Sequence, residues 1–211
     1  MFTNDRDLLA IEPNLFRDVS FLAQTIAQTT GTLSAGTLTL DDPIPAGAVG
    51  AGDVAVVNRA PLEILEVTDT TTLVVSLTRP DVAGPQLIPA DRTGATVTIC
   101  SFAPQRALIH DQLLGMLGIE PDDASVTDVV TESRITNPRD LVLVECLGAL
   151  HLIYAAASAP LAEDSPLAQR ARMYQERFAK ERSRARAKID LDGDGQPDAE
   201  RTFNVIRTTR G

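Results

Sequence analysis

The sequence predicts an α+β protein: a helical bundle domain with an inserted small antiparallel β-barrel or sandwich and an extended C-terminal arm. Apolar residues recur at helical spacing in the first thirty residues and again after residue 102. Between these segments, apolar and polar residues alternate in short runs rich in Thr and Val. We therefore expect a helical domain from residues 1–30 and 103–189, a β domain from residues 31–102, and an Asp-rich turn with an arm over residues 190–211.

The first thirty residues predict two helices. Thr3 or Asn4 can cap a short helix that runs to Ala10. Pro13 ends it, because the residue before a proline is disfavoured in the α conformation. Beyond the proline, an apolar stripe recurs at helical spacing, and its members are Leu15, Val19, Leu22 and Ile26. This stripe predicts an amphipathic helix that ends where Gly31 supplies a stop.

The β domain is predicted from five runs of Thr, Val, Ile and Leu separated by Pro-, Gly- and Asp-rich turns. These runs are residues 32–40, 54–58, 62–67, 72–78 and 95–100. Short strands at this spacing predict a small barrel or sandwich, whose closure protects strand edges. The proline-rich segment 79–93 is expected to be a mobile loop or, alternatively, a long surface connection.

The chain after residue 103 predicts three further helices. A stripe of leucines predicts the first, and its members are Leu108, Leu113, Leu114 and Leu117. Asn137 caps the second, with Pro138 in its first turn. Because residues 139–158 are apolar almost all round, this helix is expected to be the central buried one. The third covers residues 166–189 and is expected to pack through Leu167, Ala171, Tyr174 and Phe178.

Charge is distributed unevenly along the chain. The 19 Lys and Arg stand against 29 Asp and Glu, a net charge of −10. Residues 165–188 hold eight Lys or Arg against two Glu, a net charge of +6, so the remaining residues carry −16. A basic strip on an acidic body suits an acidic patch on a neighbouring subunit or the phosphates of DNA. Along this strip Arg170, Arg177 and Arg184 repeat every seven residues.

Composition also indicates the compartment. No apolar run approaches twenty residues, and the first residues lack the basic and hydrophobic regions of a signal peptide. We therefore expect a protein that is neither exported nor membrane-spanning. Cys100 and Cys146 have no CxxC or His–Cys spacing, so we expect buried thiols in a reducing compartment, with a disulfide as the alternative.

The sequence lacks the common catalytic motifs: it contains no GxSxG, HExxH, GxxxxGK[ST] or GxGxxG. His110, which stands beside Asp111, and His151 lie in apolar segments. We interpret both as structural, hydrogen-bonded histidines rather than general bases. Catalysis through His110 and Asp111 is the alternative, and the sequence offers it no third group. We therefore predict that the protein is not an enzyme.

The segment DLDGDGQPD has the spacing of a calcium loop, with oxygen donors at positions 1, 3, 5 and 9. The donors are Asp190, Asp192, Asp194 and Asp198. It resembles the loops of EF-hands and, more closely, those of thrombospondin type 3 repeats. Arg201 occupies position 12, where an EF-hand has its bidentate acid. We therefore predict no cofactor and an Asp/Gly-rich turn, with weak Ca²⁺ binding as the alternative.

The order of these segments resembles the head-to-tail adaptor, or connector, proteins of tailed bacteriophages. The likeness rests on the apolar helix NPRDLVLVECLGALHLIYAAAS, the following helix YQERFAKERSRARAKIDLDGDG and the short tail. It includes a loose A-x₂-Y-x₂-R-F pattern and covers residues 104–211. The inserted residues 31–102 depart from the smallest members of that family, which leaves open whether the β domain faces outward or toward the next neck ring.

The resemblance implies a structural protein of the virion neck that is assembled in the host cytoplasm and has no membrane partner. In that family twelve copies form a ring under the portal protein, around a channel for the packaged DNA, and join the capsid to a downstream neck or tail protein. It implies a subunit interface or DNA channel at Arg170, Arg177 and Arg184. It also implies a portal-binding arm, whose candidate residues are Phe203, Val205, Ile206 and Arg207.

An alternative function belongs to another class. The protein would be a calcium-binding adhesion or scaffolding module, with the Asp-rich loop as its functional site and the β domain as its ligand-binding part. Such modules are mostly extracellular, so the missing signal peptide and the two cysteines count against this interpretation.

Overall fold

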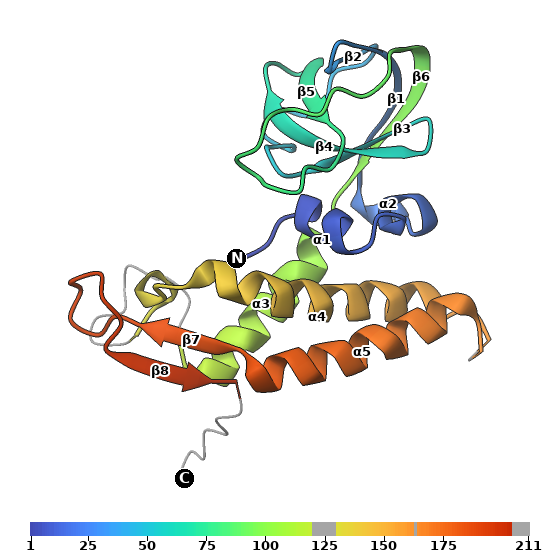
Figure 1. Ribbon diagram of the computed structural model, residues 1–211. Coiled ribbons are helices and arrows are strands. Elements are labelled where there is room, and N and C mark those ends of the chain that lie inside the picture. Colours follow the sequence, from blue (N-terminus) through green and yellow to red (C-terminus); the bar gives the residue numbers. More distant parts are fainter. Residues whose placement is uncertain (120–129, 163, 204–211) are drawn as a thin grey trace. The chain divides into compact units, whose positions relative to one another are not determined.

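Figure 1 shows a computed structural model of the chain, which describes residues 1–119, 130–162 and 164–203. The chain forms two compact units: a barrel unit, residues 4–103, and a helical unit, residues 1–3 with 104–211. The α+β class is therefore confirmed. The barrel unit begins at Asn4, so the segment 4–30, which the sequence assigned to the helical domain, belongs with the barrel.

Six antiparallel strands close the barrel in the order β1-β2-β5-β4-β3-β6 (Figure 1). They are β1 (Thr25–Ser34), β2 (Thr37–Leu40), β3 (Val54–Val57), β4 (Ala60–Val67), β5 (Thr72–Ser76) and β6 (Arg92–Cys100). Apolar side chains from all six strands fill the interior, as the alternating pattern predicts. Each strand pairs on both sides, so the barrel exposes no strand edge.

The run predicted as one strand over residues 32–40 is a hairpin of β1 and β2. Ala35 and Gly36 connect the strands, and both have positive φ, 48° and 80°. Ser34 pairs with Thr37, which makes a two-residue turn of the kind that matches the twist of paired strands. The turn explains why the barrel has six strands where the sequence predicted five.

The helix predicted over the stripe from Leu15 to Ile26 is wrong. The structure has α1 (Asp5–Ile11), which Asn4 caps as expected, then α2 (Leu15–Asp18), a short 3₁₀ turn η1 (Leu22–Gln24) and the start of β1. Leu22 is 93% exposed, so the stripe does not form one buried face. Thr25 instead pairs with Cys100 on β6. Pairing with β6 and the β-branched residues of this segment favour a strand over a helix.

The helical unit contains α3 (Ala103–Leu117), a 3₁₀ turn η2 (Glu132–Arg134), α4 (Pro138–Ser158), α5 (Pro166–Arg184), β7 (Arg186–Ile189) and β8 (Ala199–Thr202). Helices α4 and α5 lie side by side, and the buried rings of Tyr154 and Tyr174 stack between them with centroids 5.7 Å apart. Helix α3 begins and ends as predicted, but Leu108 of the predicted stripe is 51% exposed, and Ile109 takes its place in the core.

Helix α4 is most deeply buried along its middle, from Val144 to Leu150, as its composition predicts. It is the one helix of the described residues that is long and apolar enough to cross a membrane. In this structure 56% of its most apolar window is buried inside the protein, as in the core helix of a folded domain. Asn137 stands at the predicted N-cap position, but its side chain bonds Asp140 and β7 rather than capping α4.

The last helix is shorter than predicted, because α5 ends at Arg184 and residues 186–189 form β7. Ala187 and Ile189 are fully buried while Arg186 and Lys188 are exposed, so the burial period here is two. Strand β8 pairs with β7 in a hairpin whose turn is the Asp-rich segment. Residues 190–203 are therefore folded into this hairpin and its end rather than extended as a free arm, and residues 204–211 lie outside the described residues.

Gly148 of α4 faces side chains of both α3 and α5. A Cβ atom at this position would lie 2.8 Å from Cγ2 of Ile109 on α3 and 3.0 Å from Cε2 of Phe178 on α5. Both distances are shorter than van der Waals contact, so a side chain here would push the helices apart.

We predict that Gly148→Ala lowers the free energy of unfolding by about 1–3 kcal/mol, because overpacking outweighs the gain in helix propensity. Gly115→Ala on the exposed side of α3 is the control, since an added Cβ there meets nothing within 4 Å. That control should leave stability unchanged or raise it by up to about 1 kcal/mol. Denaturant unfolding of both variants measures the difference, and equal effects would contradict the close packing at Gly148.

Candidate functional site

The three arginines of the predicted basic strip have different environments. Arg170 is half-buried: its Nη1 atom donates to the hydroxyl of Tyr154 at 3.1 Å, and its guanidinium lies 5.5 Å from that ring. Arg177 is exposed and lies 5.6 Å from the ring centre of Tyr174. Arg184 is exposed at the end of α5. Arg170 therefore helps to hold α4 against α5, while Arg177 and Arg184 remain on the surface.

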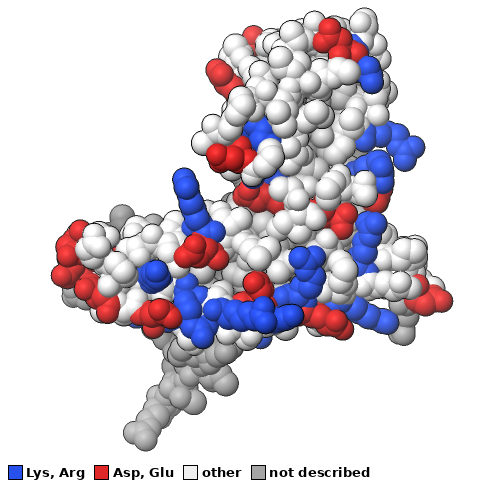
Figure 2. All heavy atoms as spheres, in the orientation of Figure 1, with Lys and Arg blue, Asp and Glu red and all other residues white. Residues whose placement is uncertain are grey.

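A shallow groove runs between α4 and α5, with a volume of about 210 Å³. We call it the α5 groove, and its lining consists of Leu143, Leu147, Arg177, Lys180, Glu181 and Arg184. The leucines form an apolar floor, in which Leu143 remains 41% exposed. Figure 2 shows Lys and Arg side chains gathered along α5 and β7.

The cations beside this groove have no acidic partner in the described part of the chain. Arg177, Lys180 and Arg184 make no ion pair with a carboxylate there. All three side chains are exposed, and Arg177 keeps its contact with the ring of Tyr174. Arg170, by contrast, is half-buried. An apolar floor beside three unpaired cations suits a ligand that has both an apolar side chain and negative charge.

The Asp-rich turn joins β7 to β8 and brings three of its four predicted donors together. Oxygen atoms of Asp190, Asp192 and Asp194 all lie within 4.8 Å of one another. Asp198 does not join them, because its Oδ2 atom accepts the backbone N–H of Leu191 at 2.8 Å. The carboxylates of Asp192 and Asp194 also accept N–H groups within the turn. The Asp side chains thus stabilise the turn by accepting its backbone N–H groups.

Basic side chains oppose a cation at this turn. The carboxylate of Asp190 accepts the backbone N–H groups of Gly193 and Gly195, and Nη1 of Arg134 lies 4.0 Å from it. These hydrogen bonds, foremost the one from Gly193, lower the pKa of Asp190, and Arg134 adds to the effect. Arg201 points elsewhere and donates to the carbonyls of Leu117 and Gly118 at the end of α3, both at 3.0 Å. The position-12 ligand of a calcium loop is therefore replaced by a helix cap.

The predicted portal-binding residues are only partly described. Phe203 is 2% exposed and belongs to the buried core, so it is not a free contact residue. Val205, Ile206 and Arg207 lie outside the described residues. Burial of Phe203 follows from its place directly after β8, which brings it against the helical unit.

A buried polar cluster, centred on Glu145, was not predicted from the sequence. Glu145 is fully buried on α4. Its carboxylate accepts the Thr3 hydroxyl at 2.6 Å, the backbone N–H groups of Phe2 and Thr3, and Nδ1 of His110 at 2.8 Å. The signal for this cluster was a single Glu in an apolar helix, which requires a polar partner when it is buried.

His110 lies between two carboxylates, because its Nε2 atom is 3.0 Å from Oε2 of Glu132, in a contact poorly aligned for a hydrogen bond. A neutral imidazole has one N–H and one lone pair, so it can donate to only one of them. Burial by itself lowers the pKa of His110, but the contacts with Glu145 and Glu132 outweigh it, and the pKa is raised. His110 is thus a hydrogen-bonded structural residue, as interpreted from the sequence.

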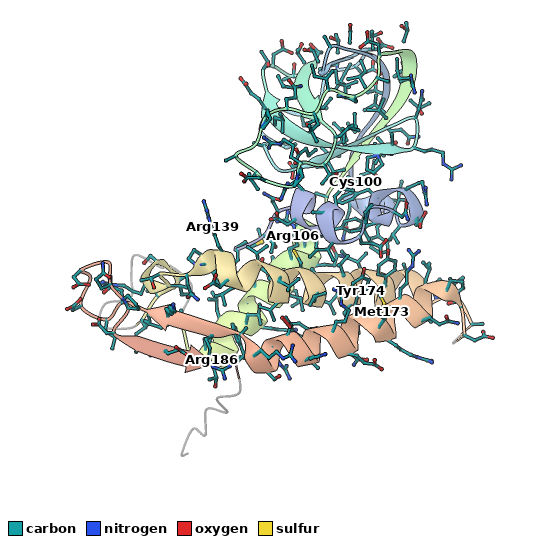
Figure 3. All side chains as sticks on the ribbon, in the orientation of Figure 1. Cys100, Arg106, Arg139, Met173, Tyr174 and Arg186 are labelled. Atoms are coloured by element: carbon teal, nitrogen blue, oxygen red, sulfur yellow. The ribbon has the colours of Figure 1, made fainter. Side chains whose placement is uncertain are left out.

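The other candidate residues do not form a reactive group. Asp111 is exposed, and the ring nitrogens of His110 contact Glu145 and Glu132 instead. Nδ1 of His151 bonds the carbonyl of Ala171 at 3.1 Å. Cys100 and Cys146 are buried thiols that form no disulfide, as predicted, and Figure 3 labels Cys100 at the end of β6. Burial raises the pKa of Cys100 to about 11, and Asp5 adds to this effect, so the thiol is not an activated nucleophile.

The barrel unit has its own buried ion cluster. Glu63 on β4 is 1% exposed and accepts from Nε of Arg6 at 2.9 Å and from Nε of Arg79. Arg79 also donates to the carbonyl of Gly84, so the loop predicted over residues 79–93 is tied to the barrel. This cluster lines a pocket of about 370 Å³, but its charges are already paired.

Comparison with protein-family models, characterised proteins and solved structures finds no match for this chain.

We predict that His110 stabilises the helical unit most strongly at low pH. Because its folded-state pKa is raised, this stabilisation is complete below the ordinary pKa and is lost as the pH rises through the folded-state value. The difference in unfolding free energy between the wild type and His110→Gln should therefore be largest near pH 6 and shrink at higher pH. Denaturant unfolding across this range measures it, and a pH-independent difference would rule out the charged imidazole.

We predict that Ca²⁺ binds the Asp-rich turn weakly, because Arg134 lies beside Asp190 and because Arg201, at position 12, supplies no carboxylate. Isothermal titration should give no saturating heat below millimolar Ca²⁺. The variant Asp192→Asn with Asp194→Asn serves as the control and should show the same trace. A dissociation constant in the micromolar range that the variant loses would establish a calcium site instead.

Proposed function

We propose that the protein is a head-to-tail adaptor of a tailed bacteriophage, a structural virion protein that forms a ring under the portal and joins the capsid to the tail around the DNA channel. The observation that carries this proposal is the separation of charge on the helical unit. The acidic turn lies at one end, and the basic α5 groove lies along α5 (Figure 2).

A ring subunit needs two different, complementary surfaces, because a heterologous contact that closes on itself generates a cyclic oligomer. The acidic turn and the α5 groove supply surfaces of opposite charge on one folded unit. The likeness in layout to adaptor proteins favours a ring in the neck of the virion, and that family implies twelve copies. Assembly takes place in the host cytoplasm, and no membrane takes part.

The helical unit supports a structural role better than a catalytic one. Its buried polar groups are engaged in holding the fold, since Glu145 bonds residues 2, 3 and 110. In the described residues we identify no nucleophile within reach of a free base, and we therefore propose that the protein is not an enzyme. Clustering of Asp190, Asp192 and Asp194 keeps a calcium-binding adhesion or scaffolding module as the second candidate.

An adaptor has two further contacts, one with a downstream neck or tail protein and one with the portal. The barrel unit has its own closed core and is the part we assign to a downstream neck or tail protein. Phe203 belongs to the core, so the portal contact is assigned to the residues after it, including Val205, Ile206 and Arg207. Two apolar residues in a basic tail suit a groove or a strand edge on the portal.

We predict that deleting residues 204–211 prevents incorporation of the protein into filled heads while leaving the fold intact. The deletion must not begin earlier, because residues 199–202 form β8 and Phe203 is buried. Complementation of a phage that lacks the adaptor measures tailed particles, and circular dichroism checks the fold.

Val205→Asp with Ile206→Asp should have the same effect as the deletion, because charge removes the apolar contact. Thr208→Asp with Thr209→Asp is the matched control and should assemble normally. Normal yields of tailed particles from the deletion variant would refute the portal contact.

A further inference from the structure

The Asp-rich turn presents an apolar side chain surrounded by acids. Leu191 is 52% exposed, and Asp192 and Asp194 beside it are also exposed. The carboxylates of Asp190 and Asp198 accept backbone N–H groups of the turn, and Gly193 and Gly195 adopt φ angles of +88° and +85°, so the turn is held in one shape. A leucine flanked by carboxylates, in a turn of fixed shape, matches a partner surface that offers both apolar and basic groups.

The α5 groove has the complementary chemistry. Its floor offers Leu143 and Leu147 to an apolar side chain, and its rim offers Arg177, Lys180 and Arg184 to carboxylates. These cations have no acidic partner in the described part of the chain. DNA phosphates are a poorer match, because they have no apolar group to place on Leu143 and Leu147.

The turn cannot occupy the groove of its own copy. Strand β7 follows directly on α5 and has four residues, so it carries the turn about 13 Å beyond the helix end. The turn is also held there by Arg134, which lies 4.0 Å from Asp190. The two surfaces can therefore meet only between different copies.

We propose that the turn at the tip of the β7–β8 hairpin of one copy docks in the α5 groove of a second copy, with Leu191 over Leu143 and with Asp192 and Asp194 facing the basic rim. This contact rests on the proposed ring and identifies the surfaces that form it. It joins unlike surfaces, so every copy both donates a turn and offers a groove.

The test uses two charge-reversed forms of the full chain. The groove form carries Lys180→Glu with Arg184→Glu, and the turn form carries Asp192→Lys with Asp194→Lys. Asp190 and Asp198 are kept because they hold the turn. Sedimentation velocity at low salt measures the mass of each form alone and of an equimolar mixture.

Each form alone should sediment as a monomer, because like charges meet at the contact. The mixture should return to the assembled mass. In a ring of alternating forms, the basic turn of the turn form meets the acidic groove of the groove form, and the acidic turn of the groove form meets the basic groove of the turn form. Restored assembly also shows that neither form is unfolded. Salt near 1 M should weaken the wild-type assembly, since the Debye length falls to about 3 Å.

Two controls match these changes. Arg139→Glu with Arg92→Glu reverses the same number of exposed charges outside the groove, and Figure 3 shows Arg139 projecting away from α4 and α5. Leu161→Ser is the counterpart of Leu191→Ser, since the two leucines are 49% and 52% exposed. Only Leu191→Ser should reduce assembly, by tenfold or more in the association constant.

The outcomes separate this contact from the function. If the wild type assembles and both reversed forms assemble equally well, the proposed contact is wrong while the ring stands. If the mixture stays monomeric although both forms melt like the wild type, the contact is likewise overturned. A groove form that loses only DNA binding would assign the rim to phosphates. A wild type that is monomeric at every concentration would overturn the ring itself and the contact with it.

Discussion

The packing of the helical unit is decided by the apolar surface of α4, which must be covered by other elements. Its residues are apolar almost all round, so α3, α5 and β7 must pack against it. Gly148 lets α3 and α5 approach closely, and Glu145 is the one carboxylate buried on α4. Because Glu145 needs partners, it binds His110 and the first residues of the chain. Among the described residues, the edge of α5 and the hairpin that follows it are two surfaces that this packing leaves exposed.

Much of this fold could be predicted from local patterns. The apolar helix 139–158 and the threonine- and valine-rich strands follow from residue spacing. Two segments could not, because partners far along the chain decide their structure. Residues 25–30 form a strand because β6 lies beside them, and residues 186–189 form a strand because β8 and Ile135 pair with them. Helical spacing in these short segments was outweighed by pairing.

The candidate site was also predictable only where it depends on local sequence. The basic strip and the Asp-rich turn are visible as composition, and Arg201 marked the missing calcium ligand. Which arginines are free was not predictable, because Tyr154 draws Arg170 into the packing of α4 against α5. The groove exists only because Leu143 of α4 lies beside the basic edge of α5. Sequence spacing alone cannot bring residues of two helices together.

The ring depends on the proposed contact between the acidic turn of one copy and the α5 groove of the next. Electron microscopy of the purified wild-type chain at low salt tests this most directly. We predict end-on views of closed rings of uniform size, in which each subunit contacts two neighbours through different surfaces. Particles of monomer size alone, or symmetric dimers joined through the same surface of both copies, would contradict the claim.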